Sequence, residues 1–349
     1  MKIIVCPDSF KGTMTAIEAA QAIKQCIIDV LAAPEVVLLP VGDGGEGTAE
    51  SIALACKDTV EEEVVTVDTM DPLRRHLKAS YHIMDFEEGR TALIESAAAS
   101  GLTLVDPKDR DIMRSDTYGT GLLIADAYRR GIRSFMIGMG GTATCDAGWG
   151  AYQALRDLKM PDASFSLLCD VENPLAGPHG AAAVFAPQKG ATDDQIPLLD
   201  NRLRARAEEY RKISGVDTLS SKYAGAAGGL AAMFMALYGA TPFSGIQKVL
   251  ELTGFRKHLE DADLLITGEG RADVTTLSGK APKGILDAAR ERGVPVALIG
   301  GKVMNKELLQ SAGFSHVLQA TPDKPDPSIS PADYLTDSIR RLFLKTIKK

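Results

Sequence analysis

Residues 2–7 read KIIVCP, an uninterrupted apolar run ending in proline that predicts a buried β-strand. A helix is expected over 15–31, where apolar residues recur at helical spacing, and a second strand over 36–40. A second helix is expected over Thr48–Cys56. This alternation of strands and helices is typical of a parallel sheet in an α/β protein.

The pattern changes near residue 60 and returns near residue 260. Residues 61–67 and 77–84 alternate apolar and polar positions around an Asp-Pro turn, which indicates two half-buried antiparallel strands. Further on we expect strands over 91–94, 134–137, 166–170, 181–185, 263–267, 296–299 and 316–319, and helices over 95–100, 121–130, 193–212, 226–238, 282–292 and 306–312, with a polar helix at the end.

These segments predict two α/β domains. Residues 1–60 and 260–349 form one discontinuous, Rossmann-like parallel-sheet domain, and residues 61–259 form a second α/β domain inserted into it. The cleft between two such domains is the default position of a ligand site. We therefore expect the active site in that cleft.

Three glycine-rich, acidic segments follow expected strands. They read GDGGEGT (42–48), GMGGTATCD (138–146) and TGEGRAD (267–273). Glycine lets backbone N–H groups approach a phosphate, and carboxylates suit a hydrated Mg²⁺. Because ligands of α/β sheets bind at the carboxyl ends of strands, the three segments favour nucleotide phosphate chemistry.

Each of these segments also has a structural interpretation. Asp43 and Glu46 have the spacing of a helix capping box, although this would not explain four surrounding glycines. Arg271 with its acidic neighbours is either a surface ion pair or an anion site. The Gly138 segment matches a loose dinucleotide fingerprint, but Asp146 would repel a pyrophosphate there.

The same choice between a functional and a structural role applies to two lysines and to a second glycine cluster. Lys11, after Asp8 and Ser9, could pair with a phosphate or be solvated. Lys189 could bind an anion or belong to a plain turn, and the glycines of 225–229 could serve function or close helix packing.

Composition narrows the class of protein. The chain has 349 residues and a net charge of −7, which argues against a nucleic-acid partner. No apolar stretch is long enough to span a membrane. The five cysteines form no C-x-x-C pair and the five histidines no metal spacing, so neither disulfides nor zinc are expected and cytoplasm is the default location.

Taken together, the motifs resemble the type I glycerate kinase family. The stretches that carry the resemblance run in family order over nearly the whole chain: PDSFKG (7–12), DGGEGT (43–48), YGTG (118–121), GGTATCD (140–146), NPLAGPHG (173–180), PQKGA (187–191), AGAAGGL (224–230), TGEGRAD (267–273) and GKAP (279–282). The resemblance implies ATP-dependent phosphorylation of D-glycerate with Mg²⁺, 2-phosphoglycerate as the product, and a site between two domains.

On this resemblance we expect a defined set of residues at the site. Candidate catalytic residues are Lys11, Asp43, Glu46, Asp146, Glu269, Arg271 and Asp273, with Asp43, Asp146 and Glu269 as candidate metal ligands and Arg271 as a clamp for the glycerate carboxylate. Candidate substrate- or nucleotide-binding residues are Asp8, Ser9, Gly44, Gly45, Gly140, Gly141, Thr142, Lys189, Gly268, Gly270 and Lys280.

The chain departs from the family pattern in three places. Residues 156–165 form a shortened connection, Cys-Asp-Ala-Gly replaces the more usual Asn-Asp-Gly-Gly around Asp146, and Thr275 stands where Gln is common. The alternative function is a nicotinamide-dependent oxidoreductase acting on a small hydroxy acid, based on the Gly138 segment. The general base, the lobe that binds ATP, and the choice between monomer and homodimer stay open.

Overall fold

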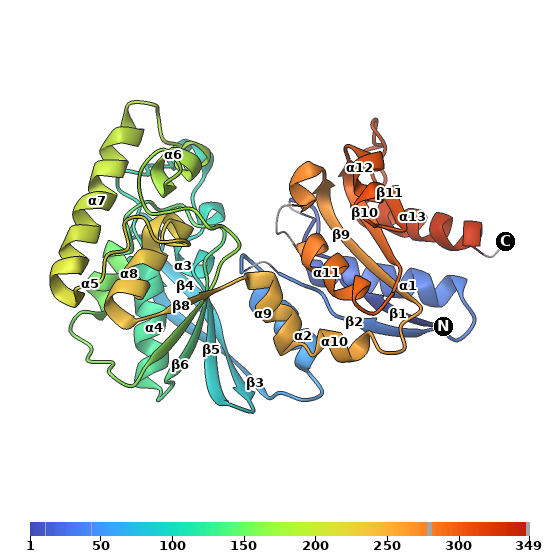
Figure 1. The fold of residues 1–349 in the computed structure, drawn as a ribbon, viewed down its shortest axis with the longest axis horizontal. Helices are drawn as coiled ribbons and strands as arrows, with labels where there is room; N and C mark the ends of the chain where they lie inside the picture. The colour runs from blue at the N-terminus through green and yellow to red at the C-terminus, as the bar shows by residue number, and fades with distance from the viewer. Residues whose placement is uncertain (11, 43, 278–280, 347–349) are drawn as a thin grey trace. The chain divides into compact units, whose positions relative to one another are not determined.

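The structure, a computed structural model, describes residues 1–10, 12–42, 44–277 and 281–346 (Figure 1). The chain divides into two compact units. The first unit contains Met1–Gly42, Glu50–Asp58 and Ile246–Lys349, and the second contains Asp43–Ala49 and Thr59–Gly245. The positions of the two units relative to one another are not determined.

The first unit is built on a five-stranded parallel sheet with the order β11-β10-β9-β1-β2. Its strands are β1 (Lys2–Val5), β2 (Glu35–Leu38), β9 (Leu264–Ala272), β10 (Val296–Val303) and β11 (His316–Gln319). Its helices are α1 (Ala16–Val30), most of α2 (Thr48–Cys56) and of α9 (Gly245–Leu252), α10 (Phe255–His258), α11 (Ala281–Arg290), α12 (Lys306–Ser311) and α13 (Pro331–Thr346), with the 3₁₀ turn η5 (Val274–Leu277).

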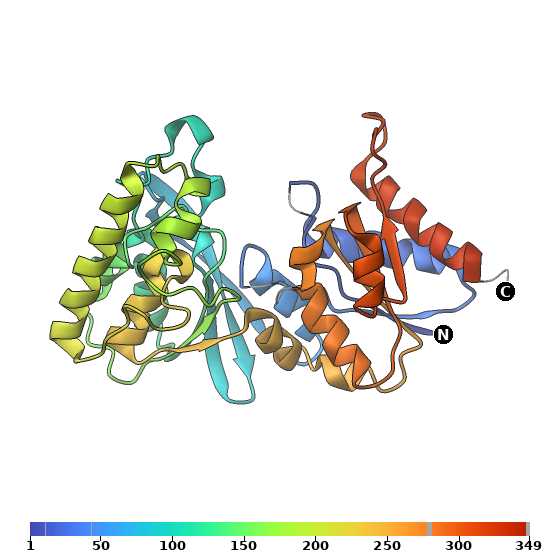
Figure 2. The same cartoon turned by 45° about the horizontal axis from the view of Figure 1, so that its top comes forward.

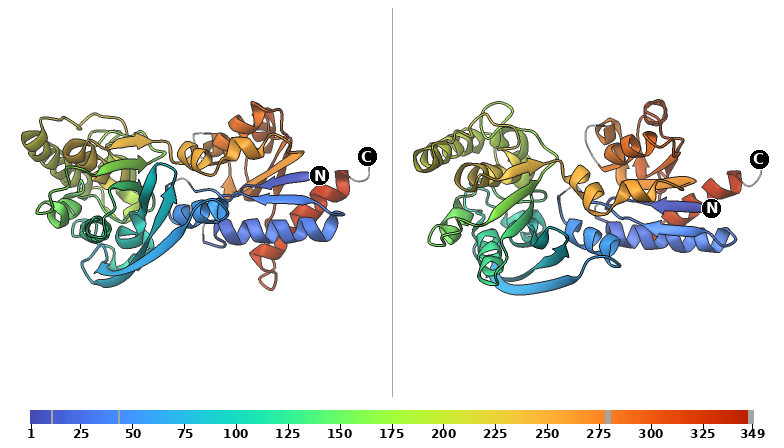
Figure 3. Two further views of the ribbon diagram at one scale, coloured as in Figure 1. Left: turned by 90° about the horizontal axis from the view of Figure 1, so that it is seen from below. Right: turned by 60° about the horizontal axis from the view of Figure 1, so that its bottom comes forward.

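One face of this sheet is covered by α1 and α13, which lie side by side (Figure 3). Ile3 and Ile266 from the sheet, Ile23 from α1 and Ile339 from α13 are all fully buried in one cluster. Helix α1 begins with the capping box that Thr15 and Glu18 predict: the Thr15 hydroxyl accepts from the Glu18 N–H, and the Glu18 carboxylate accepts from the Thr15 N–H.

The second unit has a six-stranded sheet with the order β3-β4-β5-β6-β7-β8. The pairs β3–β4 and β4–β5 are antiparallel and the others are parallel, so the predicted antiparallel pair is confirmed. The strands are β3 (Glu62–Met70), β4 (His76–Phe86), β5 (Gly89–Glu95), β6 (Ser134–Gly138), β7 (Ser164–Leu168) and β8 (Thr241–Phe243).

Helices cover this sheet, and the long helix α7 packs on α6 and α8 (Figure 2). The helices are α3 (Ala97–Ser100), α4 (Tyr118–Arg129), α5 (Trp149–Leu155), α6 (Ala181–Phe185), α7 (Gln195–Ser214) and α8 (Leu230–Tyr238), with the 3₁₀ turns η1 (Leu102–Leu104), η2 (Pro107–Asp109), η3 (Pro187–Lys189) and η4 (Ala226–Gly229). Among the described residues, no helix is both long and apolar enough to cross a bilayer.

Several sequence predictions differ from the structure. The strand expected over 181–185 is helix α6, whose alanines Ala181 and Ala182 are buried. Strand β8 was not expected because it has three residues and contains Pro242, which an edge strand tolerates. The glycine-rich segment expected as a turn after the strand at 263–267 is mostly strand, since β9 continues to Ala272.

The compact units change between Asp58 and Thr59, next to the predicted boundary near residue 60, and between Gly245 and Ile246, upstream of the one predicted near residue 260. Residues 43–49 group with the second unit, and residues 246–259 group with the first. The chain therefore passes from one unit to the other within the first turns of helices α2 and α9, and also after residues 42 and 58.

Candidate functional site

The turn that precedes α2 is packed backbone-to-backbone on the strand ends of the second unit. The Gly140 N–H donates to the Gly44 carbonyl at 2.9 Å. A Cβ atom at Gly44 would lie 2.4 Å from the Leu168 carbonyl oxygen, one at Gly138 2.6 Å from the Gly44 oxygen, and one at Gly140 2.6 Å from Gly45 Cα. These glycines are required because two turns meet without space for side chains.

Glu95, at the end of β5, binds the start of helix α2. Its Oε2 accepts from the Gly47 N–H at 3.1 Å and its Oε1 from the Ala49 N–H at 2.9 Å. Because α2 begins at Thr48, Glu46 lies before the helix and not within its first turn. Sequence reasoning missed Glu95 because the residue that it caps is far away in the chain.

Glu46 is the exposed acidic residue of this turn. Its side chain is exposed and, among the described residues, its carboxylate forms no hydrogen bond or ion pair. The Thr48 hydroxyl instead faces inward and accepts from the Gly44 N–H at 3.1 Å. Asp43 lies outside the described residues.

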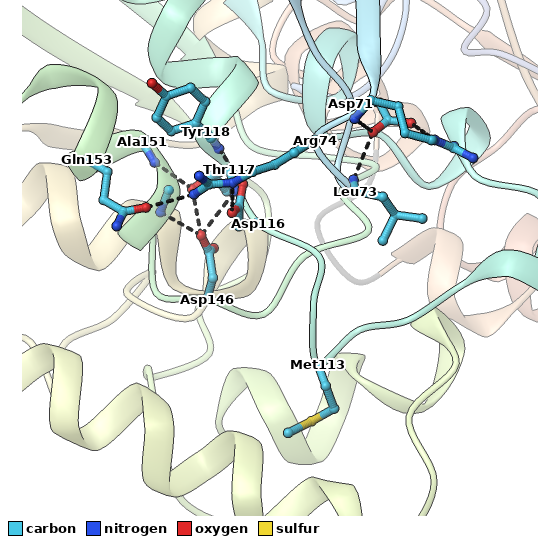
Figure 4. A network of polar contacts seen from close by, with 12 residues as sticks. Asp71, Leu73, Arg74, Met113, Asp116, Thr117, Tyr118, Asp146, Ala151 and Gln153 are labelled. Atoms are coloured by element: carbon cyan, nitrogen blue, oxygen red, sulfur yellow. Dashed lines mark hydrogen bonds and ion pairs between the residues drawn. The ribbon is translucent and has the colours of Figure 1, made fainter.

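Asp146 is buried and its carboxylate is surrounded by donors (Figure 4). Oδ2 accepts from the Thr117 N–H, the Thr117 hydroxyl and the Gly150 N–H at 3.0, 2.8 and 2.9 Å, and Oδ1 accepts from the Gly148 N–H at 3.2 Å. Burial raises the pKa of Asp146, while the bonds from Gly150 and Thr117 act in the opposite direction. This arrangement ties the start of α5 to the start of α4 and favours a structural role.

Lys189 is a buried cation. Its Nζ donates to the Thr142 hydroxyl at 3.1 Å and to the Thr144 carbonyl at 2.8 Å. Burial lowers the pKa of Lys189 to about 8. The structure thus brings together three predicted binding residues, Lys189, Thr142 and the adjacent Gly141, at one turn.

Two left-handed turns pack against each other beside this lysine. Ala147 and Gly148 have φ values of 56° and 74°, and Gly228 and Gly229 have values of 65° and 92°. A Cβ atom at Gly228 would lie 2.0 Å from the Thr144 carbonyl oxygen, and one at Gly229 would lie 2.8 Å from Ala147 Cα. The glycines of the 225–229 segment therefore serve close packing.

In the first unit, the ends of β1 and β9 lie next to each other. The Asp8 N–H donates to the Gly268 carbonyl at 2.8 Å, and the Asp8 Oδ1 accepts from the Ser9 N–H at 2.6 Å. A Cβ atom at Gly268 would lie 3.0 Å from the Phe10 ring. Strand β2 lies on one side of the β1–β9 pair, and β10 and β11 lie on the other side. The order of the strands therefore reverses at this pair, and open α/β sheets bind ligands at such a switch point.

The acidic residues of β9 and its following loop are tied to that loop. Glu269 is buried and accepts a 2.6 Å bond from the Thr276 hydroxyl. Asp273 pairs with the Arg271 Nε at 2.9 Å and accepts from the Thr275 N–H at 2.8 Å and hydroxyl at 2.6 Å. Arg271 itself is 69% exposed.

The predicted site residues therefore form two groups, one in each unit. Lys11, Asp43 and Lys280 lie outside the described residues. Across the described ranges, no three His, Cys, Asp or Glu side chains gather as a metal site. The metal roles of Asp43, Asp146 and Glu269 stay predictions. The second-unit group contains Gly44, Gly45, Glu46, Gly140, Gly141, Thr142, Asp146 and Lys189, and the first-unit group contains Asp8, Ser9, Gly268, Glu269, Gly270, Arg271 and Asp273.

Comparisons with known proteins agree on one family. The model of the glycerate kinase family matches residues 3–160 and 156–337. A glycerate kinase of Bacillus subtilis is 40% identical, with 92% of this chain and 89% of that protein covered, and the glycerate 2-kinase of Escherichia coli is 38% identical, with 87% and 86% covered. A crystal structure from Salmonella typhimurium LT2, assigned to glycerate kinase 2, superposes with a TM-score of 0.82 at 33% identity and covers 100% of this chain and 99% of its own.

These findings give no support to the nicotinamide alternative. The glycines on which it was based, Gly138 and Gly140, are in contact with the backbone of the 44–49 turn. They are therefore already occupied by packing within the second unit.

Proposed function

Because the chain belongs to the glycerate kinase family, we propose that it transfers the γ-phosphoryl group of ATP to D-glycerate and forms 2-phosphoglycerate. The family match over nearly the whole chain is the observation that carries the proposal. The name of the Escherichia coli relative supports transfer to the 2-hydroxyl.

Mg²⁺ fits the second-unit group through Glu46. Mg²⁺ in kinases is usually held by one or two carboxylates, substrate phosphates and water, so a preformed cage is not required. The exposed Glu46 carboxylate lies in a turn held by Glu95 and is free to bind the ion. The carboxylate oxygens of Asp146, in contrast, already accept hydrogen bonds from backbone and hydroxyl donors. When bound, the ion would neutralise charge on the transferring phosphoryl group. Asp43 remains a candidate second carboxylate, and Glu269 a less exposed one.

Each of the two groups contains positive residues that would bind an anionic substrate. Arg271 pairs with Asp273 through Nε and is exposed, so its guanidinium would also bind a carboxylate or phosphate. Lys189 would act less directly, since both of its bonds hold the 142–144 turn. Lys11 and Lys280 are proposed phosphate ligands from the sequence alone.

We also propose a cellular location for the protein. All five cysteines are buried free thiols, which supports a reducing location such as the cytoplasm.

Product identification tests the proposal directly. Purified protein is incubated with D-glycerate, ATP and Mg²⁺, and the product is followed by ³¹P and ¹H NMR. We expect a phosphomonoester coupled to the proton on carbon 2. A product coupled to the carbon 3 protons would refute the proposed regiochemistry, and the absence of any phosphoglycerate would refute the activity.

A further inference from the structure

Strands β9 and β10 continue together past the point where β1 ends. In this extension Arg271 is the paired partner of Lys302, and Ala272 is the partner of Val303. Ala272 is fully buried, whereas Arg271 and Lys302 are exposed. Because the two residues are register partners and both side chains are exposed, the two cations lie on neighbouring strands at the same level of the sheet.

Like charges directly opposite on neighbouring strands are destabilising. Asp273 offsets part of this repulsion through its ion pair with Arg271. Among the residues that the structure describes, the Lys302 ammonium has no hydrogen-bond or ion-pair partner. The Lys302 ammonium is therefore available to an anionic ligand beside Arg271.

The position of the pair is that of a ligand site. It lies at the carboxyl ends of β9 and β10, at the second-last residue of each strand, and β9 forms the switch point with β1. Immediately before the pair, Gly270 and Gly301 approach so closely that a Cβ atom at Gly301 would lie 2.6 Å from the Gly270 oxygen. The two strands are therefore packed backbone to backbone directly before the cations.

We propose that Lys302 and Arg271 form an oxyanion subsite that binds a substrate oxyanion, either a phosphate of ATP or the carboxylate of glycerate. This inference rests on the proposed kinase function and adds Lys302, which no motif marked. Arg271 would bind two oxygens through its Nη atoms, and Lys302 would contribute a compact point charge beside it.

The test compares Lys302→Gln with Lys306→Gln, which removes another exposed lysine of the same unit. We expect Lys302→Gln to raise KM by about fivefold or more for one substrate, roughly 1 kcal/mol of binding. If KM for ATP rises, the subsite binds phosphate, and if KM for glycerate rises, it binds the carboxylate. The melting temperature without ligand should stay equal or increase, because the charge repulsion is removed.

The result that overturns the subsite is a Lys302→Gln variant whose two KM values match those of the control. A lower melting temperature with both KM values raised equally would also refute it, since that indicates a structural role. Pyrophosphate separates this proposal from the kinase proposal. If the wild type has no glycerate kinase activity but is stabilised by pyrophosphate, and Lys302→Gln is not, the subsite stands and only the kinase function fails; equal stabilisation of the two proteins refutes a phosphate subsite.

Discussion

Replacing Asp146 by asparagine tests whether this carboxylate is a structural tie or a reacting group. In Asp146→Asn, the amide oxygen can take the place of Oδ2 and accept from Thr117 and Gly150. The amide NH₂ then faces the Gly148 N–H, which now lies 3.2 Å from Oδ1. Two donors would meet at a buried position.

The magnitude follows from these contacts. Leaving the buried Gly148 N–H without an acceptor costs about 1–3 kcal/mol. The bonds to the other oxygen change from charge-assisted to neutral and lose roughly half their strength. Removing a charge that burial disfavours offsets part of this loss. We expect a net decrease of about 2–3 kcal/mol in the free energy of unfolding, or roughly 5–10 °C in Tm for a unit of this size.

The assay measures Tm and, at 25 °C, the steady-state kinetics of folded protein. If Asp146 is structural, kcat and KM stay within about threefold of the wild type while Tm falls. Thr117→Val is the matched control, because it removes the 2.8 Å donor from the same tie, and the double variant should be less than additive. A decrease of about a hundredfold in kcat with an unchanged Tm would refute this interpretation and place Asp146 in the reaction.

Three further predictions address the rest of the site. Glu46→Gln should raise the Mg²⁺ concentration that gives half-maximal rate by about threefold or more, whereas Glu50→Gln, an exposed acid within α2, should not; equal Mg²⁺ titrations would contradict the metal role. Gly140→Ala should lower kcat by about tenfold or more, because its methyl group would lie 2.6 Å from Gly45 Cα and displace the turn; wild-type kinetics would show that the turn is not part of the site. Burial lowers the pKa of Lys189 from 10.5 to about 8, so the unfolded chain binds more protons between these values and Lys189 contributes stability as pH rises through this range. The unfolding free energy of the wild type relative to Lys189→Met should therefore increase by up to about 3 kcal/mol from pH 8 to 10.5 in chemical denaturation, and a flat or falling difference would contradict the assignment.

Local patterns were sufficient for much of the fold. The capping box at Thr15 and Glu18 and the helical spacing after it predict α1, and β11 lies where the returning alternation of strands and helices placed it. These features depend on neighbours in the chain, and so the sequence contains their whole cause. Short elements failed for the opposite reason: β8 exists only because β7 offers it a partner.

Glycine was the least specific signal. A glycine that lets a phosphate approach and a glycine that lets another backbone approach look identical in a sequence, because both sites exclude Cβ. Gly44, Gly140 and Gly228 prove to contact backbone within the second unit. Glu95 could not be predicted for a different reason. Its two hydrogen bonds to the start of α2 join residues that no local sequence pattern connects.

The rate of ADP formation as a function of D-glycerate, at fixed ATP and Mg²⁺, tests the central claim most directly. We predict a saturable rate that requires both D-glycerate and Mg²⁺ and that is negligible with ATP alone. A rate of ATP consumption that does not change when D-glycerate is added would contradict the assignment of this chain as a glycerate kinase.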